Sequence, residues 1–111
     1  MREGSSSPWG PVQHAETLAP GAWRVDTAGH GGIKLDAARN RKVPGAARAA
    51  GGWYEEDCQW AIAAYVHTDV GDAMLKRARA ADPAKYDGTA YLEETLKRWE
   101  SVAVLDALGI A

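Results

Sequence analysis

The stretch Trp23–Leu35, which reads WRVDTAGHGGIKL, decides the fold. Apolar and polar residues alternate from Trp23 to Thr27 and again from Ile33 to Leu35, and this period of two is typical of β-strands with one buried face. The residues between these two pieces, 28–32, include three glycines, which permit the backbone conformations of a tight loop. We therefore expect a β-hairpin with His30 at its tip.

The residues before the hairpin favour extended structure. Three prolines and two glycines within residues 8–22 favour extended segments and turns over helix, and Val12 is expected to begin a short edge strand. Residues 1–8 are small and polar, so we expect a disordered tail there and a single domain over residues 9–111.

The residues after the hairpin predict helices. Asp36 is a suitable N-cap for a short helix over Ala37–Lys42, which Pro44 must end. Helical spacing of apolar residues predicts a second helix over Tyr54–Val66 and a third from about residue 68 to Ala81. It also predicts helical structure near the C-terminus, either as one helix or as two helices divided near Ser101. The fold class is therefore α+β, with a small antiparallel sheet packed against about three helices. The predicted core contains Trp23, Trp53, Cys58, Leu92, Leu96 and Trp99.

Composition limits the possible function classes. The chain has 111 residues, one Cys and no Phe, and it carries a net charge of −2. One Cys excludes an intrachain disulfide and fits a reducing cytoplasm, and no apolar run is long enough to span a membrane. Residues 1–54 carry seven Lys or Arg against four Asp or Glu, whereas residues 55–111 carry six against eleven. This acidic second half makes nucleic acid an unlikely partner, because nucleic-acid binding needs a concentrated basic face.

One basic cluster is present, made of Arg39, Arg41, Lys42 and Arg48. We interpret it as a solvated set of charges flanking the short helix. Direct nucleic-acid binding through these four side chains is the weakest of the functional hypotheses.

Several motifs together resemble a known family. They are WGPVQ at Trp9–Gln13, TAGHGGIKL at Thr27–Leu35, the pair Arg39–Asn40, and WYEEDCQWA at Trp53–Ala61. Together they resemble a family of small uncharacterised proteins encoded by bacteriophages and other mobile elements, over roughly residues 9–65. That family has no established biochemical activity. Because small phage proteins often bind and disable a host system, the resemblance implies a host-directed inhibitor, for example one that acts on a CRISPR effector.

A cysteine-dependent enzyme is one hypothesis for the chemistry. Cys58 would be the nucleophile, His30 the base, and Glu56 or Asp57 the group that orients the imidazole, in a hydrolase or transferase. A position in the first turn of a helix lowers a thiol pKa, whereas the neighbouring carboxylates raise it. The alternative is that Cys58 packs in the core as a small apolar side chain.

A metal or cofactor site is not expected. Glu55, Glu56 and Asp57 are consecutive, so they would splay around a helix instead of converging on one ion. Carboxylates in a first helical turn also have a structural explanation, since they stabilise the positive end of the helix dipole. His30 is expected to be a buried, hydrogen-bonded tie between the hairpin and this helix, donating to Glu56 or Asp57.

The leading hypothesis is a small binding protein without catalytic activity. Its predicted contact patch contains Glu55, Glu56, Asp57 and Trp60, because Trp is enriched at interface hot spots and acidic groups complement a basic partner. His30, Trp23, Trp53 and Trp99 are predicted to be structural. The expected partner is a host protein, for example a CRISPR effector subunit, and the chain itself is expected to be a monomer or a homodimer.

Overall fold

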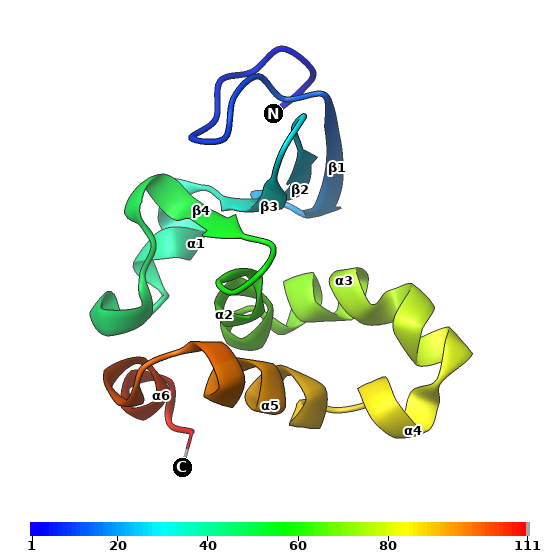
Figure 1. Cartoon of the computed structure of the whole chain (residues 1–111), viewed down its shortest axis with the longest axis vertical. Helices are drawn as coiled ribbons and strands as arrows, with labels where there is room; N and C mark the ends of the chain where they lie inside the picture. The colour runs from blue at the N-terminus through cyan, green and yellow to red at the C-terminus, as the bar shows by residue number, and fades with distance from the viewer. Residues whose placement is uncertain (111) are drawn as a thin grey trace.

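A computed structural model describes residues 1–110 and has an α+β fold (Figure 1). Its antiparallel sheet has the strand order β1-β2-β3-β4. The strands are β1 (His14–Ala19), β2 (Ala22–Asp26), β3 (Gly31–Leu35) and β4 (Trp53–Glu55). In Figure 1 the N-terminal segment lies above this sheet and the helices α2 to α6 lie below it.

The predicted hairpin is confirmed as β2 and β3. Trp23 pairs with Lys34 and Val25 with Gly32, and the turn between the strands is closed by the Thr27 amide, which donates to the His30 carbonyl at 2.8 Å. The expected edge strand is β1, which begins at His14. The predicted α+β class is therefore correct, although the sheet has two more strands than the hairpin.

The prediction of a helix over Tyr54–Val66 is wrong in its first half. Tyr54 belongs to β4, where it pairs with Ile33 of β3, and helix α2 begins only at Trp60. The edge of β3 presents backbone amides and carbonyls that would have no partner if Tyr54 were helical. In addition, the hydroxyl of the buried Tyr54 donates to Asn40 at 2.6 Å and accepts from the Ala49 amide at 3.2 Å. The strand pairing and the two hydroxyl bonds hold Tyr54 in a strand, although its apolar neighbours in the sequence recur at helical spacing.

The other helices agree more closely with the predictions. Asp36 accepts a hydrogen bond from the Arg39 amide and caps α1, and α3 ends before Pro83, as expected. Of the two alternatives for the C-terminal region, the structure has two helices, because the Ser101 hydroxyl caps a separate last helix. The helices are α1 (Ala37–Arg41), α2 (Trp60–Val66), α3 (Thr68–Ala81), α4 (Pro83–Tyr86), α5 (Ala90–Trp99) and α6 (Val102–Leu108), with 3₁₀ turns η1 (Gly45–Ala47) and η2 (Ala50–Gly52).

Helix α2 lies at the centre of the molecule and contacts β3, β4, α3 and α5. Its residues Ala61–Ala64 are all buried, and the three alanines among them let the neighbouring elements approach closely, while Ile62 fills the core. Leu92 and Leu96 of α5 are buried against this core, as predicted. No helix in the described part of the chain is both long and apolar enough to cross a membrane.

The tryptophans lie mostly outside this core. Residues directly paired across a sheet share a face, so Trp23 and Trp53, both paired with Lys34, lie on the face opposite to that of Tyr54. There the Trp9 ring packs edge-on against Trp53, with 5.5 Å between ring centroids. Trp23 and Trp53 are therefore half-buried on the outer face of the sheet, instead of lying in the main core as predicted.

Trp99 departs furthest from the prediction. It is the last residue of α5 and is 58% exposed, so its assignment to the core is wrong. By helical spacing Trp99 falls on the same side of α5 as the buried Leu92 and Leu96, but it is the last residue of the helix, and the burial of that side does not extend to it. Its ring instead lines a surface pocket, described below.

Candidate functional site

The three consecutive carboxylates of the predicted patch lie in different surroundings. Glu55 lies in β4, where its Oε1 atom is 3.3 Å from Nδ1 of His30. Glu56 lines a small pocket of about 130 Å³, and Asp57 lines a larger one of about 350 Å³. Trp60 lines both pockets, so it lies between Glu56 and Asp57. The predicted patch is thus divided over three locations, joined by the indole of Trp60.

His30 is at the hairpin tip, as expected, but its other predicted features are wrong. The side chain is 54% exposed, and its partner is Glu55 of the neighbouring strand instead of Glu56 or Asp57. The turn between β2 and β3 points away from α2 (Figure 1). His30 therefore joins the turn to β4 at the surface.

The surroundings of Cys58 favour a protonated thiol. Burial raises the pKa of the Cys58 thiol, and the nearby carboxylates of Glu55, Glu100 and Asp57 raise this pKa further. The side chain is half-buried and not in the core. Because the thiolate is the reactive form of cysteine, these groups oppose a nucleophilic role at neutral pH. Within residues 1–110, no group of three or more His, Cys, Asp or Glu side chains is placed to hold a metal ion.

The larger pocket is the main concave feature near these residues. Its apolar walls are the rings of Trp60, Tyr91 and Trp99. Its charged groups are the carboxylates of Asp57 and Glu94 and the cations of Lys85 and Arg98, and Thr95 completes the lining. The pocket joins the turn before α2, the helix α4 and one face of α5.

Five of the lining residues come from α5, and their spacing explains why. Residues 91, 94, 95 and 98 recur at three- and four-residue intervals, which places them along one stripe of a helix, and residue 99 borders this stripe next to the buried side. Leu92 and Leu96 occupy the buried side. The apolar spacing of α5 indicates only its buried side, so the stripe was not predicted from sequence. The one signal of this stripe in the sequence is a Tyr, a Glu and an Arg at helical spacing, and this signal does not show which residues form the other wall of the pocket.

The charged groups of the pocket differ in their partners. The Lys85 ammonium lies over the rings of Tyr86 and Tyr91, at 5.2 and 5.9 Å from their centroids. Asp57, Glu94 and Arg98 are exposed, and in the described chain none of these three takes part in an ion pair. The pocket thus combines aromatic walls with charges of both signs that are available to a ligand.

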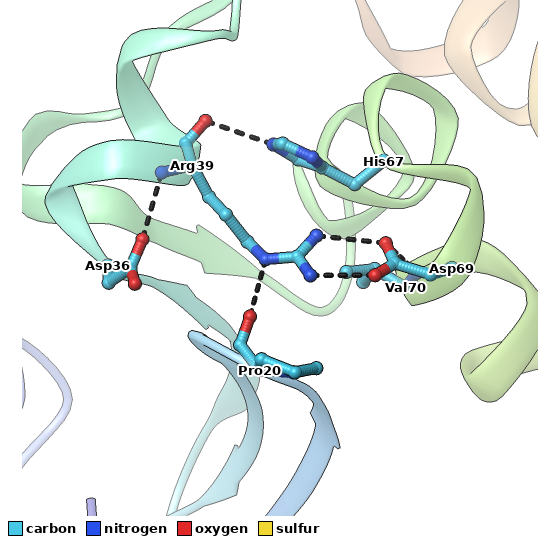
Figure 2. A network of polar contacts seen from close by, with 6 residues as sticks. All are labelled: Pro20, Asp36, Arg39, His67, Asp69 and Val70. Atoms are coloured by element: carbon cyan, nitrogen blue, oxygen red, sulfur yellow. Dashed lines mark hydrogen bonds and ion pairs between the residues drawn. The ribbon is translucent and has the colours of Figure 1, made fainter.

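A second polar network holds the basic cluster in place (Figure 2). The Arg39 guanidinium binds Asp69 through two bonds of 2.8 and 2.6 Å and donates from Nε to the Pro20 carbonyl at 2.7 Å. The Nε2 atom of the buried His67 donates to the Arg39 carbonyl at 2.9 Å. Arg48 likewise donates to the Val43 carbonyl. Two of the four cations that we expected to be solvated therefore have structural partners.

Comparison with known proteins places the chain in a family without assigning an activity. A family model described as a domain of unknown function, DUF7007, matches residues 2–107. No curated protein and no solved structure matches the chain. Membership of an uncharacterised family, as the motifs indicated, is therefore confirmed, while a phage or mobile-element origin stays a prediction. With nearly all of its residues matched, the chain belongs to the DUF7007 family.

Proposed function

We propose that this chain is a non-catalytic binding protein that recognises another protein through the pocket lined by Trp60 and Trp99. The observation that carries the proposal is the pairing of a 58%-exposed Trp99 with Trp60 in one pocket of about 350 Å³. Exposing a large aromatic ring to water is unfavourable, and a partner that covers the ring recovers this free energy. Trp, Tyr and Arg, all present here, are the residues most enriched at interface hot spots.

The charges around the pocket support a protein partner. Asp57, Glu94 and Arg98 lie beside the aromatic rings and have no ion-pair partner within residues 1–110. Charged groups around an apolar centre are typical of protein interfaces, where they set specificity and association rate. Asp57 and Trp60 belong to the contact patch predicted from sequence, to which Trp99, Tyr91 and Arg98 are now added.

For the partner we propose a bacterial host protein, for example a CRISPR effector subunit, which the chain would meet in the cytoplasm. This part of the proposal is supported by the resemblance of the motifs to phage-encoded proteins. The acidic second half of the chain adds support, because a protein with a basic nucleic-acid channel would attract it.

The test is capture of partners by the tagged chain from the lysate of a bacterium that carries CRISPR systems, followed by binding of the purified partner. We compare the wild type with Asp57→Lys and Trp99→Ala, and use Glu16→Lys on β1 as the control for an equal change of charge. We expect a stoichiometric partner that binds the wild type and the control at least about tenfold more tightly than either pocket variant. Equal binding by all four proteins would refute the pocket as the contact site.

The alternative of a hydrolase or transferase that uses His30, Cys58 and Glu56 has less support. The raised pKa of the Cys58 thiol opposes formation of the thiolate that this mechanism needs. Glu56 lines the small pocket with Arg24, Gly32, Trp60 and Met74 and is not the partner of His30.

A further inference from the structure

The outward stripe of α5 carries two opposite charges one helical turn apart. Glu94 and Arg98 are both exposed, and four residues separate them, which is about 6 Å along the helix axis. Residues at this spacing can pair within a helix, yet no ion pair joins them in the described residues. Both charges are therefore available to a group outside the helix.

This arrangement is self-complementary. When two copies of a helix pack antiparallel about a two-fold axis, residue i of one copy faces residue j of the other, and j faces i. An axis that crosses α5 midway between Glu94 and Arg98 places each Glu94 opposite the Arg98 of the second copy. This two-fold arrangement thus pairs all four charges, the Glu94 and Arg98 of both copies, in two identical ion pairs.

Exposed apolar surface lies next to this stripe, where a second copy would cover it. Apart from Met1, the large hydrophobic residues that are exposed in residues 1–110 are Trp99, at 58%, and Val102, at 72%. They lie at the end of α5 and the start of α6, next to Arg98. Apolar surface beside paired charges is the composition of a dimer interface.

We propose that a second copy of this chain docks on the pocket face, with the two α5 helices antiparallel and with Glu94 of each copy bound to Arg98 of the other. The second copy contributes its own Glu94 and Arg98 to the pocket and removes Trp99 from water. This inference concerns the purified chain and does not depend on the proposed function. Because both use the pocket, self-association and partner binding exclude each other.

The experiment is sedimentation velocity of the purified chain over a roughly hundredfold range of concentration. We compare the wild type, Glu94→Arg, Arg98→Glu and the double swap E94R/R98E. Glu16→Arg on β1 is the control for a charge reversal elsewhere on the surface. Far-UV circular dichroism checks that each variant is folded.

We expect a reversible dimer for the wild type and the control. Each single reversal places like charges opposite one another twice, so it should raise the dimer dissociation constant by about tenfold or more. The double swap restores both ion pairs and should restore the dimer. An equimolar mixture of the two single variants should form a heterodimer, because one chain then carries two cations and the other two carboxylates.

Three results would overturn the proposal. The first is a wild-type chain that stays monomeric at every concentration, and the second is a dimer that neither single reversal weakens. The third is a double swap that remains as weak as the single variants while folded. Because no partner protein is present, none of these results bears on the capture experiment.

Discussion

At the scale of single residues, Gly32 shows how closely the sheet and its outer layer approach each other. A Cβ at this position of β3 would collide with the backbone carbonyl of Tyr54 and lie 2.7 Å from the Trp9 ring. The carbonyl belongs to a paired strand and cannot move without breaking the β3–β4 ladder. Gly32 is therefore required by packing, in addition to its place beside the hairpin loop.

We predict that Gly32→Ala lowers the free energy of unfolding by about 1–3 kcal/mol, the usual cost of overpacking. Gly45 is the matched control, because a Cβ there has no atom within 4 Å. Gly45→Ala should stay within about 0.5 kcal/mol of the wild type or stabilise the chain slightly. Urea denaturation measures both variants, and equal stability of the two would contradict the packing argument.

Cys58 provides a second prediction at this scale. Because burial and nearby carboxylates raise the pKa of its thiol, its thiolate fraction at pH 7 is smaller than in the unfolded chain, by about tenfold for each unit of elevation. Alkylation by iodoacetamide at pH 7 should therefore be slower in the folded protein than in denaturant, with a rate that is still rising at pH 9. Fast alkylation of the native chain at neutral pH would instead support the cysteine-dependent enzyme.

At the scale of elements, the pair Arg39–Asp69 joins α1 to the start of α3 and, through Pro20, to the turn between β1 and β2 (Figure 2). The pair is bidentate, and the Arg39 side chain is only 17% exposed. His67 adds a bond to the Arg39 backbone from the junction of α2 and α3. The Arg39 guanidinium and backbone carbonyl thus connect α1 to the β1–β2 turn, to α3 and to the junction of α2 and α3, which explains how a short helix without buried residues keeps its place.

This pair predicts a pH dependence of stability. Hydrogen bonding to Arg39 is the main cause that lowers the pKa of Asp69 from 3.8 to about 2. A lowered native pKa means that the unfolded chain binds the proton first as the pH falls. The stabilisation by the pair is therefore complete above about pH 5 and is lost progressively as the pH falls from about 4 through about 2.

The variant Asp69→Asn isolates this effect. At pH 7 it should lower the free energy of unfolding by about 1 kcal/mol, a discounted value because the Asp69 carboxylate is half-exposed. The difference from the wild type should shrink as the pH approaches 2. Asp72→Asn removes another exposed aspartate that pairs with an arginine, within α3, and serves as control. A difference that stays constant from pH 7 to pH 2 would show that the Arg39–Asp69 bonds do not contribute.

At the scale of the whole molecule, the sheet and the helices share one core. Ile33 of β3, Tyr54 of β4, Ala61 of α2 and Leu96 of α5 belong to the same buried cluster. Helix α2 touches both the sheet and α5, so neither half can keep its buried surface without the other. The first seven residues also connect to this body, since the Gly4 amide donates to the Val12 carbonyl at 2.8 Å.

We predict cooperative unfolding from this shared core. At concentrations where the chain is monomeric, urea transitions followed by far-UV circular dichroism and by tryptophan fluorescence should coincide. Trp9 and Trp53 report on the outer face of the sheet, and Trp60 and Trp99 report on the pocket. A separate early transition in fluorescence, with helix content retained, would show that the sheet and helices unfold independently.

The sequence by itself determined those helices and strands that are set by interactions between residues close together in the chain. The alternation and glycines of Trp23–Leu35 define the hairpin, Asp36 caps α1, Pro83 ends α3, and Ser101 separates the last two helices. In each case the deciding interaction joins residues close in the chain, so period, cap and breaker rules apply. The α+β class follows from these elements.

Only the tertiary structure decided what depends on distant partners. Tyr54 is part of a strand because its backbone pairs with the edge of β3 and its hydroxyl bonds to the Asn40 side chain and the Ala49 amide. Helical spacing cannot reveal these partners. Trp99 is exposed because the burial of the Leu92–Leu96 side of α5 does not extend to the last residue of the helix, which helical spacing cannot reveal. The candidate pocket exists because α5 packs beside the turn that carries Asp57 and Trp60. Its lining residues form two groups, 57–60 and 85–99, that are 25 or more positions apart in the chain. Burial of apolar surface brings them together, because it does not depend on how far apart residues are in the sequence.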